Sequence, residues 1–312
     1  MRDRFTRGGR KVAAGRQRGK GLGIRAPTAL PVALPAVVQH GAHRYIATLM
    51  AVPPAEPHPS LVPFRPTATR TLTVFGGPVE LVLVPGRKAR KDAARSDRPP
   101  FGRSPATRIV RDEAFWRSDG LALTPNRYPF AHHQRILWTT RPVRDPDLAL
   151  WAAAADWADR SNGTALVNNI GAAATIARAH AHLLPERLPF LGALPDRRCE
   201  LDLVDLPASA ELVVKDAPFC LLGVRGPAAA RAEVLLLLAE ARLTPAWNVV
   251  IEDGTVWVFP RRIETPAPHF SHALGAAEVW GRWCFLDEQP FAAATTADLE
   301  RALVAAGTPP LG

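Results

Sequence analysis

Short apolar runs separated by turn residues follow one another from about residue 70, and each predicts a β-strand. The runs 72–75 and 79–84 flank a Gly-Gly-Pro turn at 76–78, which predicts a hairpin. The clearest hairpin signal is an Asp-Gly dipeptide between two β-rich runs, 247–251 and 255–259. Further strands are expected at 135–139, 164–168, 176–184, 200–204, 211–214 and 219–224.

Helix signals lie between these runs. Asp145 is predicted as the N-cap of a helix whose first position is a proline, and a second helix is expected at 227–242. A third, at 296–306, begins with a capping box of Thr295 and Asp298 and ends at a glycine. Strands and helices interleave, but hairpins are common. The pattern therefore favours an α+β fold, an antiparallel sheet with flanking helices, over a doubly wound parallel sheet.

Composition divides the chain into three regions. Residues 1–70 are first basic and then Pro-rich, so they are expected to be largely irregular, apart from a short strand near 45–47. Residues 71–195 and 196–312 carry most of the helix and strand signals and are predicted to form two halves. The 47% apolar and 22% charged content fits a globular protein, and no apolar run approaches the ~20 residues that span a bilayer. No membrane association is expected.

The net charge of +10 is concentrated at one end of the chain. Residues 1–25 hold nine basic residues against one acidic residue, which accounts for +8. We expect these residues to form a disordered basic arm. If the arm binds a partner, the expected contact is weak and non-specific, to nucleic-acid phosphates. A transit peptide and an unnatural upstream extension are alternative interpretations. The three cysteines lie far apart, which is typical of reduced thiols in a cytoplasmic protein. The Lys-poor, Ala/Arg/Pro-rich composition suggests a bacterial protein.

The strand predicted at 176–184 carries the candidate chemistry. Because alternate strand residues share a face, Arg178, His180 and His182 line one face, and the small apolar residues between them can pack on a helix. An imidazole can attack phosphorus near neutral pH, an Arg can bind phosphate oxygens, and a second His can assist a leaving oxygen. Two structural histidines or a metal-binding His-x-His pair fit the same spacing, although no third metal ligand is evident.

The longer run from Thr175 to Pro185, TIARAHAHLLP, resembles the histidine triad signature, in which a hydroxyl residue precedes three alternating histidines and a proline follows. In this register Arg178 occupies the first His position, His180 that of the central nucleophile, and His182 the third. A competing register, similar to the His-x-His-x-Gln form of the transferases, makes His182 the nucleophile and replaces the glutamine with leucine. The spacings to the threonine and the proline favour His180.

Other segments extend the resemblance across residues 100–305. The segment 126–137, NRYPFAHHQRIL, is similar to the family's nucleotide-binding segment, with His-Gln where the family has Gly-His. The runs 247–262 and 278–281 resemble the second half of the larger members. Those members are galactose-1-phosphate uridylyltransferases, diadenosine tetraphosphate phosphorylases and GDP-hexose phosphorylases. The resemblance implies a histidine-triad-like (HIT-like) α+β fold with two HIT-like halves, the second degenerate.

The resemblance also implies an activity. We expect a nucleotidyltransferase or phosphorylase, with hydrolysis as a variant, that acts on a dinucleoside polyphosphate or nucleoside-diphosphate sugar through a nucleotidyl-histidine intermediate. His180 is the expected nucleophile and His182 assists at the bridging or leaving oxygen. The predicted phosphate-binding residues are Arg178, Asn168, Asn169 and Gly171. The predicted nucleoside-binding residues are Asn126, Tyr128 and Phe130.

The arginine at the first His position is the main departure from the family. In the family the backbone carbonyl of that position orients the nucleophile, and Arg178 supplies a carbonyl equally well, so activity is expected to survive. No metal or cofactor is expected to be required, with Mg²⁺ as an optional companion of the polyphosphate. The expected assembly is a monomer or homodimer.

Two other classes stay open. One is a non-catalytic nucleotide- or RNA-binding protein with a degenerate HIT-like fold, which the basic arm and the incomplete triad suggest. The other is a metal-dependent phosphohydrolase that uses His180 and His182 as ligands.

Removal of residues 1–25 separates an enzyme from a nucleic-acid binder. An enzyme keeps its turnover, because the arm is outside the predicted catalytic strand. A binder loses salt-sensitive RNA affinity, because the arm supplies most of the phosphate contacts. Turnover and RNA filter binding at low and high salt, on full-length and truncated protein, check this. Unchanged salt-sensitive RNA binding after truncation would show that residues 1–25 do not make the contacts to RNA.

Overall fold

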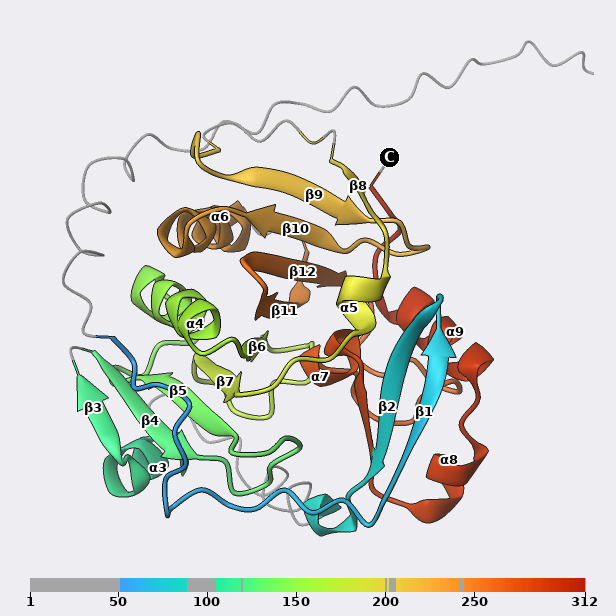
Figure 1. Ribbon diagram of the computed structural model, residues 1–312, viewed down its shortest axis with the longest axis horizontal. Helices are drawn as coiled ribbons and strands as arrows, with labels where there is room; N and C mark the ends of the chain where they lie inside the picture. Colours follow the sequence, from blue (N-terminus) through green and yellow to red (C-terminus); the bar gives the residue numbers. More distant parts are fainter. Residues whose placement is uncertain are drawn as a thin grey trace, which may run out of the picture. The chain divides into compact units, whose positions relative to one another are not determined.

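The computed structural model describes residues 51–88, 105–118, 120–199, 201, 206–241 and 244–311. Within them the chain forms two β-sheets and flanking helices, the α+β class that the sequence predicts (Figure 1). Of the predicted irregular region 1–70, residues 51–67 contain neither helix nor strand, whereas residues 68–70 already belong to a strand that begins at Ala68. The basic arm, the strand expected near 45–47 and most of the strand expected at 200–204 lie outside the described residues.

The larger sheet has ten strands, and every pair of neighbours in it is antiparallel. Its order is β3-β4-β5-β7-β6-β11-β12-β10-β9-β8. The strands are β3 Trp116–Ser118, β4 Leu121–Pro125, β5 Arg135–Thr139, β6 Thr164–Asn168, β7 His180–Leu184, β8 Asp196–Arg198, β9 Glu211–Lys215, β10 Leu222–Arg225, β11 Ala246–Glu252 and β12 Thr255–Arg261.

The large sheet consists of two five-stranded parts with the same topology. From each outer edge inward, the strands follow the order first, second, third, fifth, fourth, and the two fourth strands, β6 and β11, pair at the centre. In both parts one long helix connects the third and fourth strands: α4 (Leu148–Arg160) in the first and α6 (Ala228–Ala241) in the second. The strand β12 is thus the counterpart of β7. This repetition is the arrangement expected of two HIT-like halves.

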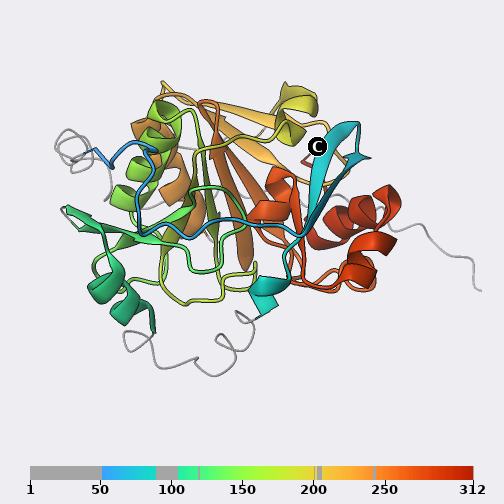
Figure 2. The same ribbon diagram turned by 60° about the horizontal axis from the view of Figure 1, so that its bottom comes forward.

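The two faces of the large sheet bury separate cores. Helices α4 and α6 pack together on one face, over apolar residues that include Ala165, Val249 and Val256. The other face, with Leu166, Val250 and Trp257, contributes to a core shared with the smaller sheet and the C-terminal helices. Figure 2 shows these layers on opposite sides of the large sheet. A residue on any central strand therefore belongs to one core or the other, according to its parity.

The smaller sheet joins segments that are far apart in the sequence. A hairpin of β1 (Ala68–Val74) and β2 (Gly77–Leu83) pairs through β2 with the parallel strand β13 (Arg282–Phe285). The remaining elements are η1 Pro85–Arg87, α3 Pro105–Glu113, α5 Phe190–Ala193, α7 Ala276–Trp280, α8 Glu288–Ala293 and α9 Thr296–Ala306. The C-terminal part of the chain thus returns to the hairpin at its beginning.

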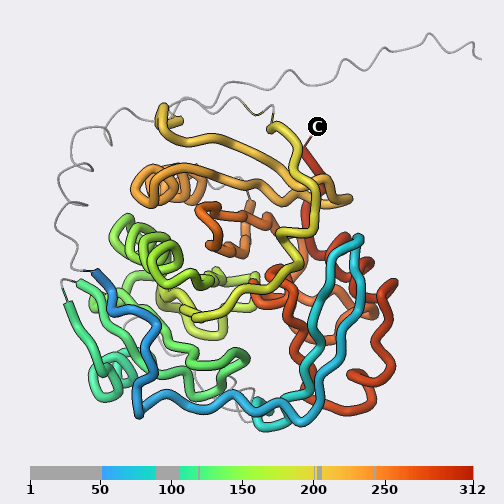
Figure 3. Tube along the Cα trace, in the orientation of Figure 1, coloured from blue at the N-terminus to red at the C-terminus, as the bar shows by residue number. Residues whose placement is uncertain are grey.

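The segment before β1 runs along the molecule from the region of β3–β5 to the β1–β2 hairpin (Figure 3). Side chains on β5 and α4 bind its main chain: Arg135 donates to the carbonyl oxygens of Pro54 and Glu56 at 3.1 and 2.9 Å, and Trp157 donates to that of Pro53 at 3.0 Å. A proline-rich segment lacks main-chain N–H donors for β-sheet hydrogen bonding. These side chains therefore hold the segment through its carbonyl groups.

Several predicted elements have the expected bounds, and others differ for identifiable reasons. Strands β5 and β6 and helix α9 match, and α9 has the predicted capping box. The first hairpin turns at Phe75 and Gly76, both with positive φ, one residue earlier than expected. Strand β10 begins at Leu222 rather than 219, because the N–H of Cys220 donates to the carbonyl of Thr308 instead of a neighbouring strand.

The N-cap of α4 is Asp147, so the prediction of Asp145 is wrong. Asp147 has extended backbone, and its carboxylate accepts a hydrogen bond from the N–H of Leu150 at 3.0 Å. Asp145 lies two residues earlier and is exposed. Both aspartates are suitable caps by type, and the position at which the backbone turns into the helix decides between them.

Substitution of the two aspartates should therefore give different results. Asp147→Ala removes an N-cap and is expected to lower the free energy of unfolding by about 1 kcal/mol. Asp145→Ala is the matched control, expected to change it by less than about 0.5 kcal/mol as an exposed substitution. Urea unfolding of the three proteins measures both values. Equal losses in the two variants would contradict the assigned cap.

Candidate functional site

The predicted chemical strand is β7, and it begins at His180 rather than at residue 176. The N–H of Ala179 donates to the carbonyl of Val143 in the loop after β5, so the preceding residues are not part of a ladder. Within β7 the parity is as predicted. Ala181 and Leu183 belong to the core under α4, and both histidines point to the opposite face.

His180 is held by the main chain two residues before it. Its Nδ1 lies 2.6 Å from the carbonyl oxygen of Arg178, and the side chain is 6% exposed. A carbonyl oxygen only accepts hydrogen bonds, so Nδ1 is the protonated nitrogen of the neutral ring. The lone pair of neutral His180 is therefore on Nε2. This is the tautomer that a nucleophile attacking through Nε2 needs.

His182 has the opposite arrangement. Its Nδ1 lies 3.0 Å from the side-chain nitrogen of Gln134, and the amide oxygen of Gln134 accepts the N–H of Phe130 at 2.9 Å. A main-chain N–H only donates, so the oxygen of Gln134 must face Phe130 and its NH₂ group must face His182. Nδ1 of His182 is then the acceptor, and the proton of the neutral ring is on Nε2.

The two imidazoles lie against each other and against aromatic rings. Their ring centroids are 5.2 Å apart, with planes at 82°. Trp138 on β5 packs beside His180 at 4.7 Å, and its indole N–H donates to Thr124 at 2.9 Å. Phe130 contacts His182 edge-on at 5.6 Å. The strand therefore presents, side by side, one histidine with an Nε2 lone pair and one with an Nε2 proton.

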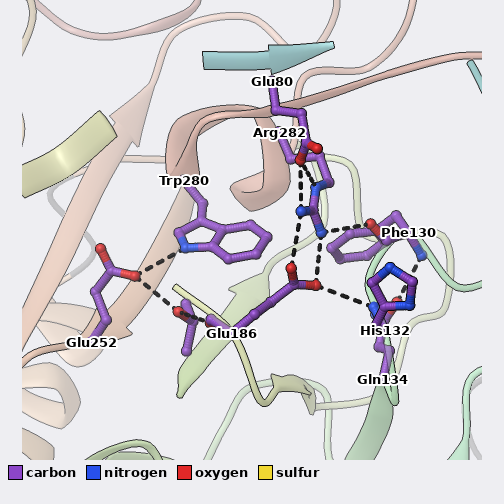
Figure 4. A network of polar contacts seen from close by, with 9 residues as sticks. Glu80, Phe130, His132, Gln134, Glu186, Glu252, Trp280 and Arg282 are labelled. Carbon is purple, nitrogen blue, oxygen red and sulfur yellow. Dashed lines mark hydrogen bonds and ion pairs between the residues drawn. The ribbon is translucent and has the colours of Figure 1, made fainter. Parts of the chain in front are cut away.

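An ionic network around the buried Arg282 fixes the loop that contains Phe130 and Gln134 (Figure 4). Arg282 on β13 donates to both oxygens of Glu186 at 2.8 and 3.0 Å and to Glu80 at 2.6 Å. It also donates to the carbonyl of Phe130 at 3.1 Å, and Glu186 accepts the N–H of His132 at 3.1 Å. The β13 strand thus anchors the loop on which the contact to His182 depends.

The structure places Arg178 just before β7, with its side chain 3% exposed. Its guanidinium donates to the carbonyl oxygens of Thr139 and Thr140 at 2.6 and 2.8 Å, and burial lowers its pKa. These contacts tie the start of β7 to the end of β5. The contribution of Arg178 that is visible at His180 is its main-chain carbonyl, and its role in phosphate binding stays a prediction.

The predicted phosphate-binding residues after β6 lie where the two parts of the sheet meet. The side-chain oxygen of Asn168 accepts from Asn248 and from the N–H of Ala276, both at 2.7 Å, and so meets the first residue of α7. The corresponding oxygen of Asn169 accepts the N–H of Trp247 at 2.8 Å. Gly171 has φ +88°, a conformation that favours glycine. By parity Asn168 shares the histidine face with Leu166, the cross-strand partner of His182.

The predicted nucleoside-binding residues lie on the connection between β4 and β5. The side chain of Asn126 accepts the N–H of Tyr128 at 3.0 Å and so stabilises the turn. Phe130 contacts His182, and Tyr128, which lies between Asn126 and Phe130 in the sequence, is partly exposed. The structure brings this segment to the histidines through Phe130 and Gln134. Which of these side chains contacts a nucleoside stays a prediction.

Three buried residues at the site were not among the sequence-based candidates. Gln134 was noted only as a departure from a Gly-His pair. Asn248 bridges Asn168 and the carbonyl of Ala172 at 2.7 and 2.8 Å. Arg261, at the end of β12, is 1% exposed and donates to Asn248 at 2.7 Å. Burial lowers the pKa of Arg261 to about 10. A buried polar residue has no signature in a single sequence.

Two other features are absent from the described residues. In these parts of the chain, no three or more His, Cys, Asp and Glu side chains are grouped so that they could hold a metal ion. Among the helices that the structure describes, none is long and apolar enough to cross a bilayer.

Glu252, at the end of β11, is a buried carboxyl group near the site. One of its oxygens accepts from the hydroxyl of Thr164 at 2.8 Å and from the indole N–H of Trp280 at 2.9 Å (Figure 4). Burial raises its pKa from 4.5 to about 7, although both hydrogen bonds act in the opposite direction. The group therefore gains a proton in the folded protein at a pH where it is ionised in the unfolded chain.

The chain is similar to solved structures of yeast Ap4A phosphorylase. The complex with Ap4A has a TM-score of 0.56 at 15% identity, over 81% of this chain and 93% of that one. The same enzyme without a named ligand has 0.55 at 16%, over 78% and 87%, and its AMP complex has 0.53 at 16%, over 78% and 89%. No protein-family model matches the chain, and no curated protein sequence matches it significantly. The likeness confirms the expected HIT-like fold.

Glu252 makes stability depend on pH in a defined direction. Between about pH 4.5 and about pH 7 the folded state holds one proton more than the unfolded state. The contribution of this proton to the free energy of unfolding is therefore fully present below pH 4.5 and falls as pH rises to about 7, by ~1.4 kcal/mol per pH unit. Glu252→Gln, which stays neutral, should remove this slope, whereas Glu240→Gln at an exposed position of α6 should keep it. Urea unfolding at several pH values measures the slopes; an unchanged slope in Glu252→Gln would contradict the assignment.

Proposed function

We propose that this chain, which has the HIT-like fold, is a nucleotidyltransferase or phosphorylase that works through a nucleotidyl-His180 intermediate. The observation that carries the proposal is the pair of opposite tautomers on β7. His180 is held with its lone pair on Nε2, and the adjacent His182 with a proton on Nε2. A displacement at phosphorus needs one group of each kind, a nucleophile and a donor to the leaving oxygen.

In the first step His180 Nε2 attacks the α-phosphorus of the substrate. A P–N bond forms, and the bond between phosphorus and the bridging oxygen breaks, with its electron pair on that oxygen. The Nε2–H of His182 donates to the leaving oxygen. The attacking ring becomes cationic, and the Arg178 carbonyl at 2.6 Å from Nδ1 stabilises this charge. The carbonyl is main-chain, so arginine can occupy the first triad position without loss of this interaction.

In the second step an acceptor attacks the same phosphorus and releases His180. Inorganic phosphate as the acceptor makes the enzyme a phosphorylase, a sugar phosphate makes it a transferase, and water makes it a hydrolase. Support for a dinucleoside polyphosphate comes from the fold, because the similar yeast enzyme is an Ap4A phosphorylase with structures in complex with Ap4A and with AMP. A nucleoside-diphosphate sugar has the same diphosphate chemistry and is the second substrate class.

The predicted binding residues are proposed to act around this reaction. The segment with Asn126, Tyr128 and Phe130 is proposed to hold the nucleoside, because Phe130 already contacts His182. The phosphate oxygens are proposed to lie toward Arg178 and the loop after β6. That loop includes Asn168, Asn169 and Gly171. The nucleophile is an imidazole nitrogen, so the attack itself needs no bound metal, and Mg²⁺ can accompany a polyphosphate substrate.

Substitution of each histidine tests the proposal and its register. His180→Ala should abolish the acid-labile nucleotidyl adduct and lower turnover by ~10³-fold or more, because the nucleophile is gone. His182→Ala should still form the adduct, at a rate lower by ~10²-fold or more. The measurement uses labelled diadenosine tetraphosphate and ADP-sugars, with and without phosphate.

His58→Gln, a substitution in the segment before β1, is the matched control and should leave adduct and turnover unchanged. If His180→Ala retains both, His180 is not the nucleophile. If His182→Ala loses the adduct while His180→Ala keeps it, the competing register is correct.

A further inference from the structure

Gln134 is the last residue before β5, and its side chain is fully buried. It occupies the position at which the resemblance would place a histidine. Its amide lies between two groups: the main-chain N–H of Phe130 at 2.9 Å and Nδ1 of His182 at 3.0 Å. The side chain thus connects the loop before β5 to the second histidine of β7.

The orientation of this amide follows from its neighbours. The Phe130 N–H can only donate, so it selects the amide oxygen, and the NH₂ group is left to face His182. Reversing the amide would put two donors, Phe130 N–H and the NH₂ group, against each other in a buried site, which costs on the order of a lost hydrogen bond. The amide therefore acts as a donor toward His182.

The loop that carries this amide is itself fixed on both sides. Arg282 donates to the carbonyl of Phe130 at 3.1 Å, and Glu186 accepts the N–H of His132 at 3.1 Å (Figure 4). The Arg282–Glu186 pair is two-pronged, with contacts of 2.8 and 3.0 Å. A short loop held by charged groups at two of its peptide units has little freedom to turn the amide away.

We propose that Gln134 is a positioning residue that holds His182 in its Nε2–H tautomer. This inference rests on the proposed function, in which that proton faces the leaving oxygen. A donor against Nδ1 excludes the tautomer with hydrogen on Nδ1, because its N–H would point at the NH₂ group. Without the amide, a neutral His182 can carry its proton on Nδ1. The lone pair on Nε2 would then face the anionic leaving oxygen and repel it.

A near-isosteric substitution reverses the polarity of this contact. Gln134→Glu keeps an oxygen for the Phe130 N–H but replaces the donor to His182 with an acceptor. His182 must then carry hydrogen on Nδ1. At acidic pH it is the imidazolium, which still has an Nε2 proton. At alkaline pH it is the neutral Nδ1–H tautomer, which has none. Gln134→Met removes both polar functions at similar size and serves as the matched comparison.

The pH dependence of kcat with diadenosine tetraphosphate and phosphate is the kinetic test. Gln134→Glu should gain an alkaline limb, with kcat ~10²-fold below wild type at high pH and a smaller deficit at low pH. Gln134→Met should lose activity without a new limb. A deficit in Gln134→Glu that is constant across pH indicates a structural role only and overturns the proposal. Thermal unfolding of both variants separates loss of fold from loss of tautomer control.

¹⁵N NMR of protein with labelled histidine tests the same proposal without any substrate. In wild type at neutral to alkaline pH, the His182 signals, assigned by their loss in His182→Asn, should show a pyridine-type Nδ1 and a pyrrole-type Nε2. In Gln134→Glu at alkaline pH the two should exchange. If the tautomer is the same in both proteins, Gln134 does not control it. If the tautomers exchange but no substrate turns over in wild type, the proposed function fails and the role of Gln134 at His182 stands.

Discussion

The hydrogen bond between His180 Nδ1 and the carbonyl oxygen of Arg178 is the contact on which the rest of the proposed site depends. It places the lone pair of the ring on Nε2. The negative end of the carbonyl dipole also stabilises the cation that forms when Nε2 binds the nucleotidyl group. It is made by the main chain, so it does not require a histidine at position 178. The side chain there is used instead to bind the end of β5. The missing first histidine is therefore compatible with an active site.

The second histidine depends on parts of the chain that are distant in sequence. Its tautomer is set by Gln134, and the loop around Gln134 is held by Arg282 on β13. Strand β13 reaches this position because it pairs with β2 in the smaller sheet. On the other side, β11 pairs with β6 and brings Asn248 to Asn168. The first part of the large sheet carries the histidines, and the C-terminal region makes their surroundings rigid.

The two parts of the large sheet have the same topology but different chemistry. Strand β12, the counterpart of β7, places Trp257 and Phe259 on the face where β7 has its histidines, and both belong to the apolar core. One repeat thus carries the two histidines proposed to react, and at the corresponding positions the other carries residues of the apolar core. The predicted boundary between the halves and the degenerate character of the second half stay predictions.

The sequence was informative where a local rule decides the structure. Short apolar runs identified β5 and β6, a capping box identified α9, and the parity of the run 180–184 assigned each side chain to the correct face. It was not informative where a distant partner decides. Whether Asp145 or Asp147 caps α4 depends on the backbone at the helix start, and β7 is shorter than its pattern because Ala179 pairs with Val143. Gln134 looked like a departure from a motif, and only its two partners in space give it a role.

In the proposed mechanism nucleotidyl transfer passes through Nε2 of His180, and the bond between phosphorus and nitrogen can be observed directly. The adduct formed from a dinucleoside polyphosphate without acceptor, on protein with ¹⁵N-labelled histidine, can be trapped at alkaline pH and examined by ³¹P and ¹⁵N NMR with peptide mapping. The proposed mechanism predicts a phosphorus–nitrogen coupling to Nε2 in the peptide that contains His180. A coupling to Nδ1, a modified His182, or a modified residue of another type would contradict it.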